Sequence, residues 1–113
     1  MQYLVQMKIV PQGRPMSAEE GEAFFEEFIH PTLEQCNKLE AEKKILAGGP
    51  ISGTIGLAVV VKADSAKELD DLVTSLPVWP RMETAITPLT TFEDRALSIE
   101  RRLSDSRAKR SAS

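Results

Sequence analysis

The 113-residue chain is poor in the side chains that build disulfides and metal sites. It has one cysteine, Cys36, and one histidine, His30. A disulfide needs two cysteines, so none can form within the chain, which fits a reducing cytoplasm. No pair of His or Cys residues has the spacing of a metal site. The sequence therefore predicts a cytoplasmic protein without a bound metal.

Long apolar runs and an excess of positive charge are absent too. The longest apolar stretch, residues 55–61, is too short to cross a bilayer, and the N-terminus lacks the pattern of a signal peptide. The formal net charge is −3, so no overall positive field would attract nucleic acid or an anionic membrane. The length fits a single domain with one core. We therefore expect neither a nucleic-acid nor a membrane partner.

Strand and helix patterns alternate along the first 92 residues. Strands are expected at residues 2–10, 45–47, 54–62 and 82–92, and helices at residues 17–39 and 65–76. Each helix opens with a capping box, at Ser17 and at Ser65. Residues 48–50, Gly-Gly-Pro, are expected to form a turn. The order βαββαβ predicts a ferredoxin-like α+β fold, with helices on one face of an antiparallel sheet.

Two prolines fall inside these elements. Pro31 lies within the first helix, so we expect either a kink near His30 or a break into two short helices. Pro88 lies in the last strand, which predicts an edge position or a bend there.

The segment from Leu76 to Leu89 resembles a known family. It begins Leu-Pro-Val-Trp-Pro-Arg-Met-Glu, where two prolines stop a helix before an alternating strand. This pattern resembles the last helix-to-strand crossing of the muconolactone isomerase family, Leu-Pro-x-aromatic-Pro-x-Met-acidic. Residues 1–7 resemble that family's opening strand, and residues 53–69 its third strand and second helix. The resemblance implies a dimeric α+β barrel, in which the second face of the sheet packs on another subunit.

The resemblance also implies an activity, the movement of a proton on a small lactone acid without metal or organic cofactor. The chain departs from the family at several positions. The family's Trp-Arg pair stands where this chain has Gly49-Pro50, its His and Lys where this chain has Leu4 and Gln6, and its tyrosine before the Met where this chain has Arg81. These differences predict a less basic and more apolar pocket than the family's.

The sheet face away from the helices predicts self-association. Leu4, Ala58 and Val60 are expected on this face, where they would otherwise meet water. A homodimer is therefore the expectation, and larger rings are known in the resembled family.

A segment beyond the four-stranded domain (residues 1–92) adds to this expectation. Residues 93–106 are predicted to form an oligomerisation helix that packs against a neighbouring subunit, and residues 107–113 a flexible tail. The apolar stripe of the helix consists of Phe92, Ala96, Ile99 and Leu103.

The candidate catalytic residues are His30, Glu26 and Tyr3. His30 is the only side chain that ordinarily titrates near neutrality, but a straight helix would leave it in solvent, so a kink at Pro31 would have to turn it inward. Glu26 lies on the same outer side of the helix, where it could be a surface charge and have no catalytic role. Tyr3 is expected on the helix-facing side of the first strand, and its hydroxyl needs a partner if it is buried.

The candidate substrate-binding residues comprise four on the inward side of the first helix and two at the mouth of the fold. They are Phe24, Phe28, Thr32, Cys36, Trp79 and Arg81. The sequence is equally consistent with Arg81 as a surface charge and with Arg81 as a side chain that binds a carboxylate. Trp79 is expected to pack under the proline turn. Cys36 without a general base beside it is not expected to be a nucleophile.

Three functions compete at this point. The leading one is a cofactor-independent isomerase that transfers a proton on a small hydrophobic cyclic or unsaturated acid. The alternatives are a cofactor-free monooxygenase of the same barrel type and a non-catalytic dimeric ligand-binding module. An inward His30 with a carboxylate partner would favour the isomerase. A flat slot lined by Trp79 and the phenylalanines would favour the monooxygenase, and a filled core the module.

Overall fold

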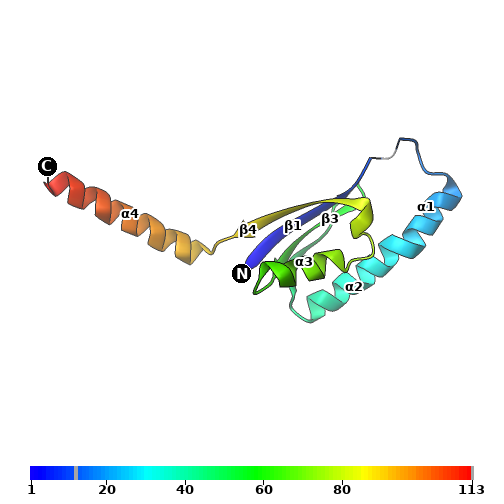
Figure 1. The fold of residues 1–113 in the computed structure, drawn as a ribbon, viewed down its shortest axis with the longest axis horizontal. Coiled ribbons are helices and arrows are strands. Elements are labelled where there is room, and N and C mark those ends of the chain that lie inside the picture. The colour runs from blue at the N-terminus through cyan, green and yellow to red at the C-terminus, as the bar shows by residue number, and fades with distance from the viewer. Residues whose placement is uncertain (12, 113) are drawn as a thin grey trace.

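The computed structural model describes residues 1–11 and 13–112. The elements follow in the order β1 (Gln2–Ile9), α1 (Ala18–Phe24), the π-helix η1 (Phe25–Ile29), α2 (His30–Ala41), β2 (Ile45–Pro50), β3 (Gly56–Lys62), α3 (Ala66–Thr74), the 3₁₀ helix η2 (Trp79–Arg81), β4 (Met82–Leu89) and α4 (Phe92–Ala112). This order confirms the ferredoxin-like βαββαβ prediction and the extra C-terminal helix (Figure 1).

The four strands form one antiparallel sheet in the order β2-β3-β1-β4. Helices α2 and α3 lie along one face of this sheet (Figure 1). β4 is an edge strand, so Pro88, which has no N–H to donate, interrupts no ladder on its outer side. The predicted edge position of Pro88 is confirmed.

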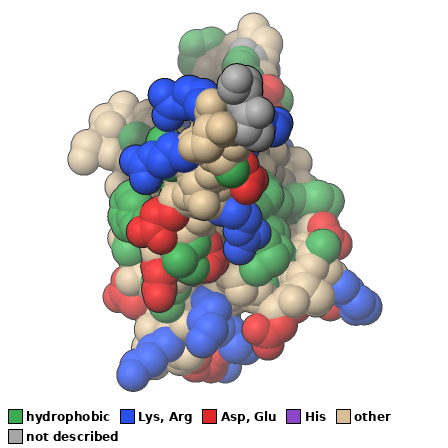
Figure 2. Space-filling view, turned by 90° about the vertical axis from the view of Figure 1, so that its left-hand side faces the viewer, with side chains coloured by type: hydrophobic (Ala, Val, Ile, Leu, Met, Phe, Trp, Pro, Cys, Tyr) green, Lys and Arg blue, Asp and Glu red, His purple; other side chains and the backbone are tan. Residues whose placement is uncertain are grey.

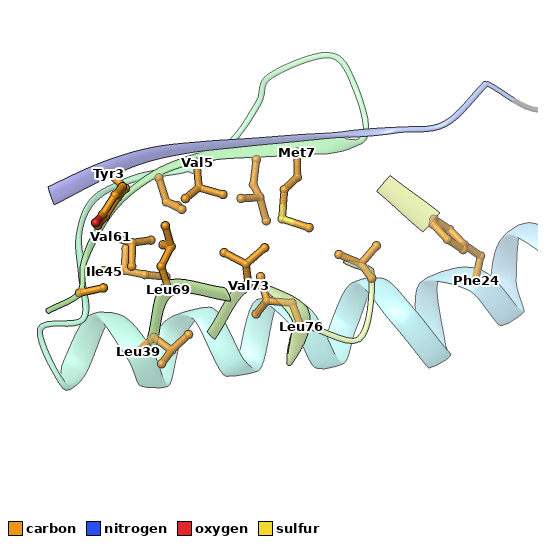
Figure 3. Packing of buried hydrophobic residues seen from close by; sticks show 14 residues of the cluster. Tyr3, Val5, Met7, Phe24, Leu39, Ile45, Val61, Leu69, Val73 and Leu76 are labelled. Atoms are coloured by element: carbon orange, nitrogen blue, oxygen red, sulfur yellow. The ribbon is translucent and has the colours of Figure 1, made fainter. Parts of the chain in front are cut away.

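The core lies between the sheet and helices α2 and α3. Alternate residues of β1 and β3 point toward the helices, and Val5, Met7 and Val61 are fully buried there. Figure 3 shows Tyr3, Val5 and Met7 facing Leu39, Leu69 and Val73 from the helices. Burial of each large apolar side chain contributes about 1.5–3 kcal/mol, so this layer is the main source of stability.

Both serine caps form, but only one is a complete capping box. The Glu20 N–H donates to Ser17 Oγ (3.1 Å), and the Ser17 N–H donates to Glu20 Oε1 (3.4 Å). At α3 the Glu68 N–H donates to Ser65 Oγ (3.1 Å), whereas the Glu68 carboxylate accepts from the Asp64 N–H (3.0 Å). The helix starts predicted from the sequence are therefore correct.

Pro31 does not break the first helix. α1, η1 and α2 form one continuous helical rod (Figure 1). Just before the proline, the His30 N–H donates to the carbonyl of Phe25, five residues back, which is a π-type bond. The π-turn accommodates Pro31, which has no backbone N–H to donate, so the helix does not divide into two separate helices.

The predicted turn at residues 48–50 is wrong. β2 continues through both glycines to Pro50, the turn occupies residues 51–55, and β3 begins at Gly56. Gly48 has φ 107°, and a Cβ placed on it would collide with the backbone of Ala58. Glycine is therefore required here by close approach of two strands and not by a turn.

Helix α4 projects away from the rest of the chain (Figure 1), and the longest dimension of the molecule is 73 Å. It begins at the predicted cap, where the Asp94 N–H donates to Thr91 Oγ1 (3.0 Å). Residues 107–112, predicted to lie in a flexible tail, are helical. Their alanine, arginine and lysine side chains favour helix, and basic groups suit a helix C-terminus. Ser113 and the side chain of Ala112 lie outside the described part of the chain.

Candidate functional site

A cavity of about 240 Å³ lies between the α1–η1 helix and the end of β1. Most of its wall is apolar, and three charged side chains face it from the rim. The lining residues are Ile9, Met16, Glu20, Ala23, Phe24, Glu27, Phe28 and Arg81. A small apolar ring with an acidic group would match both parts of this lining.

The aromatic wall comes from one side of the helix. Phe24 is buried and Phe28 half-buried, and their ring centroids are 5.7 Å apart with an interplanar angle of 37°. Figure 3 shows Phe24 apart from the labelled core residues of β1 and α3. The pair therefore leaves an apolar surface for the cavity that the main core does not cover.

Arg81 closes one side of the cavity. Its backbone is fixed by two hydrogen bonds, because the Arg81 N–H donates to the Val78 carbonyl (2.9 Å) and its own carbonyl accepts from the Val10 N–H (3.1 Å). The guanidinium lies over the Phe28 ring, with Cζ 5.1 Å from the ring centre. A cation over an aromatic face is attracted to it. The N–H donors of the guanidinium are thus held beside the apolar wall, in position to bind an anion.

Glu20 is held by a second arginine. Arg14 donates from Nη1 and Nη2 to the two carboxylate oxygens at 2.9 and 3.1 Å. These hydrogen bonds, together with those to Ser17, lower the pKa of Glu20 from 4.5 to about 2. Such a weak base stays ionised at neutral pH and is unsuited to carrying protons in catalysis.

Glu27 is the second carboxylate of the cavity, although its place in the sequence predicts a surface charge, as it does for Glu26. It is exposed and, within residues 1–11 and 13–112, no hydrogen bond or ion pair occupies its carboxylate. A helical wheel centred on the apolar stripe placed it on the outer side. The cavity instead lies along one flank of the helix, and the i, i+4, i+7, i+8 spacing of Glu20, Phe24, Glu27 and Phe28 could have indicated this shared flank.

The candidate catalytic residues are not brought together. His30 lies outside the cavity, with Nδ1 3.4 Å from Glu34 Oε1 and both side chains about 70% exposed (71% and 69%). Glu26 is exposed and lines none of the described cavities. Tyr3 is buried near the start of β1, far along the strand from Ile9, and its hydroxyl donates to Met1 Sδ (3.7 Å).

The candidate substrate-binding residues divide into two groups. Phe24, Phe28 and Arg81 line the cavity, as described. Thr32, Cys36 and Trp79 do not line it.

These three residues have other surroundings. The Thr32 side chain is 2% exposed; its hydroxyl donates to the Phe28 carbonyl (2.6 Å) and accepts from the Val78 N–H (3.1 Å), which ties α2 to the segment before β4. Cys36 is half-buried against the core, and burial raises the pKa of its thiol. Trp79, on η2, is 40% exposed, so more than half of its side chain is covered.

Two further properties concern the described residues alone. No group of three or more His, Cys, Asp or Glu side chains is placed to hold a metal ion in residues 1–11 and 13–112. Over the same residues, no helix combines the length and the apolar character that crossing a bilayer requires.

The fold and the cavity define a small α+β protein with a cavity at one end of a ferredoxin-like sheet. Residues 1–95 match the family described as muconolactone delta-isomerase. The match covers most of the sequence, so the chain belongs to this family. The resemblance carried by residues 76–89 is thereby confirmed. A search of curated proteins gives no match.

Two solved structures share the fold. A muconolactone isomerase is 21% identical over 80% of this chain and 90% of its own, with a TM-score of 0.64. The 5-chloro-2-hydroxyhydroquinone dehydrochlorinase of Burkholderia phenoliruptrix, in complex with 2,5-dihydroxybenzoquinone, is 19% identical over 83% of this chain and 98% of its own, with a TM-score of 0.58. At these identities the likeness establishes a common fold and no common reaction.

Proposed function

We propose that the protein is a cofactor-independent isomerase that moves a proton within a small hydrophobic cyclic or unsaturated acid. The observation that carries this proposal is the cavity of about 240 Å³, in which the Arg81 guanidinium and the Glu27 carboxylate, which forms no ion pair with residues 1–11 and 13–112, face an apolar wall. Membership of the muconolactone delta-isomerase family supports it.

Arg81 binds the acid group of the substrate in this proposal. A guanidinium offers a planar pair of N–H donors that matches a carboxylate, and such charge-assisted pairs are stronger than neutral hydrogen bonds. The substrate ring then lies against Phe24 and Phe28. Arg81 is already placed over Phe28, so little side-chain rotation has to be frozen on binding.

Glu27 is the proposed general base. It removes a proton from a carbon next to the carbonyl group, and the electron pair left behind delocalises into that carbonyl. The same carboxyl group then returns the proton to another carbon of the conjugated system, so a double bond shifts and no atom or electron is gained or lost. The positive charge of Arg81 stabilises the negative charge that develops on the substrate.

Deuterium exchange tests this step. Aromatic and lactone acids, muconolactone among them, are incubated with the protein in D₂O, and incorporation of deuterium is followed by NMR. Glu27→Gln should slow the exchange by about 10²–10⁴-fold, the usual contribution of a general base. Glu26→Gln is the matched control, because it makes the same change one residue away and outside the cavity. Equal losses in the two variants, or no exchange with any acid, would contradict the proposal.

Binding of the acid is tested separately. Arg81→Ala should weaken binding by roughly 10–100-fold, since a hydrogen bond to a charged group contributes about 1.5–3 kcal/mol. Calorimetry with the acids that exchange measures this change. Unaltered affinity would remove Arg81 from the site.

The filled core favours one other candidate, the non-catalytic dimeric ligand-binding module. Buried side chains of β1 and α3 belong to one core cluster, and the Arg81 cavity lies at the end of the sheet. An acid that binds in an Arg81-dependent way without exchanging any proton would identify this function. The monooxygenase hypothesis loses its expected slot, because Trp79 lines none of the cavities described.

We also infer that the protein forms a homodimer through the face of the sheet opposite the helices. Leu4 lies beside Val60 on β3 and Thr87 on β4, and no helix of the described chain covers this row. The neighbouring row contains Ala58 and Ala85, whose small side chains allow a second sheet to approach closely. Light scattering should give the mass of a dimer or larger ring at micromolar concentration. A cytoplasmic location, expected from the single cysteine, stays a prediction.

A further inference from the structure

Helix α4 exposes an apolar stripe that its own chain leaves uncovered. Phe92 is 97% exposed, and it shares one face with Ala96, Ile99 and Leu103 at spacings of four, three and four residues. Most helical stability in proteins comes from packing of an apolar face, so this face of α4 needs a partner surface.

A second apolar stripe lies uncovered on the opposite flank of the helix from the Arg81 cavity. Phe25 is 50% and Leu33 39% exposed, and Ile29 lies half-buried between them at four-residue spacing. They border an almost wholly apolar cavity of about 130 Å³, which shares no lining residue with the Arg81 cavity. A dry apolar cavity of about 150 Å³ accepts benzene, so this one has room for roughly one apolar side chain.

The two surfaces carry opposite charges. Residues 18–29 contain five glutamates and no lysine or arginine, whereas residues 101–112 contain five basic residues and one aspartate. At 100° per residue, Glu22 and Glu26 border the Phe25 stripe, and Arg102 and Arg107 border the α4 stripe. Figure 2 looks toward the tip of α4 and shows lysine and arginine side chains gathered around it.

We propose that α4 of a second copy docks antiparallel on this flank of its neighbour, defined by Glu22, Phe25, Glu26, Ile29 and Leu33. In the antiparallel arrangement, with Ile99 beside Ile29, Leu103 meets Phe25 and the basic end of α4 lies along the glutamates of α1. At 1.5 Å per residue the α4 stripe is about 17 Å long and the stripe from Phe25 to Leu33 about 12 Å, so the whole of the shorter stripe can lie against the longer one.

A second copy is the occupant because the same chain carries both complementary surfaces and α4 is directed away from its own body. Only Thr90 and Thr91 connect α4 to β4, and from there the helix runs outward (Figure 1). Opposite charges across such an interface speed association and fix its orientation. The contact lies on the other flank from Glu27 and does not depend on the proposed reaction.

Charge exchange tests the contact. Arg102→Glu with Arg107→Glu, and separately Glu22→Lys with Glu26→Lys, should each weaken the assembly at least tenfold in sedimentation velocity at micromolar concentration. A chain carrying all four substitutions should regain the wild-type mass. Arg101→Glu is the control, because it makes the same charge change on the side of α4 away from the stripe. Failure of the fourfold variant to recover, or equal dissociation by Arg101→Glu, would overturn the proposal.

Disulfide trapping gives a second test that needs no dissociation. In a Cys36→Ser background, a tagged Leu103→Cys chain is mixed with an untagged Phe25→Cys chain and oxidised, after circular dichroism has shown that both are folded. A disulfide between the two kinds of chain is expected, and Leu97→Cys, off the stripe, should give none with Phe25→Cys. Cross-links only between two Leu103→Cys chains would instead reveal α4 paired with α4 and refute the docking on α1.

Discussion

Replacing Thr32 with valine should destabilise the fold by about 2 kcal/mol. The hydroxyl of this 2% exposed side chain accepts from the N–H of Val78, a residue only 1% exposed. Valine keeps the shape but has no acceptor, so that N–H would stay buried without a partner, which costs about 1–3 kcal/mol. A domain of this size loses roughly 4 °C in Tm per kcal/mol, so Tm should fall by about 8 °C.

Equilibrium unfolding in urea, followed by circular dichroism, measures the change. Thr32→Ser is the matched control: it keeps the hydroxyl and loses one methyl, at a cost of about 0.8 kcal/mol. The dependence of the unfolding free energy on urea should be the same for all three proteins, since the surface exposed on unfolding is unchanged. If Thr32→Val were no less stable than Thr32→Ser, the bond to Val78 would contribute nothing and the reasoning would be refuted.

Three further outcomes are expected. Ser17→Ala and Ser65→Ala should each cost about 1 kcal/mol by loss of a helix cap, and a melting temperature equal to wild type would show that the cap is unimportant. Thr84→Val should be neutral or up to about 1 kcal/mol stabilising, because Thr84 Oγ1 is buried without a partner among the described residues; clear destabilisation in urea would speak against this. The pKa of Glu20 is about 2 in the folded protein and 4.5 ordinarily. As the pH falls, the unfolded chain therefore takes up this proton before the folded protein does. The stability contributed by Glu20 is complete above pH 4.5 and is lost between pH 4.5 and about 2. Arg14→Gln should reduce that part of the acid dependence and leave the share due to Ser17, and an unchanged pH profile would exclude the pair with Arg14 as its main cause.

Most of the fold could be predicted because its signals are local in the sequence. Pro77 has no N–H with which to continue α3, which ends at Thr74, and Ser17 and Ser65 satisfy amides three residues away. Alternation in β1 fixed which side chains face the helices. The reading of Gly48 failed because its cause, the backbone of Ala58, belongs to a different strand.

The cavity was harder to predict because its walls come from separate segments. Arg81, Phe24 and Phe28 were found from their own elements, but Ile9 and Met16 complete the cavity from β1 and the loop after it. No local sequence pattern indicates that these segments come together in the fold. Thr32 was placed inward correctly, yet only the tertiary structure reveals that its hydroxyl is already used by Val78.

The π-turn at Phe25–Ile29 has a consequence for the length of this helix. A π-turn takes one residue more per hydrogen-bonded ring than an α-turn does. Deleting one residue there would restore regular α-helical bonding and leave α2 against the sheet. α1 would then rotate by about 100° about its axis. Glu20 and Ala23 would leave the cavity wall while Phe28 stayed in place. A single-residue change in length at this point thus rotates α1 about its axis and determines which of its side chains line the cavity.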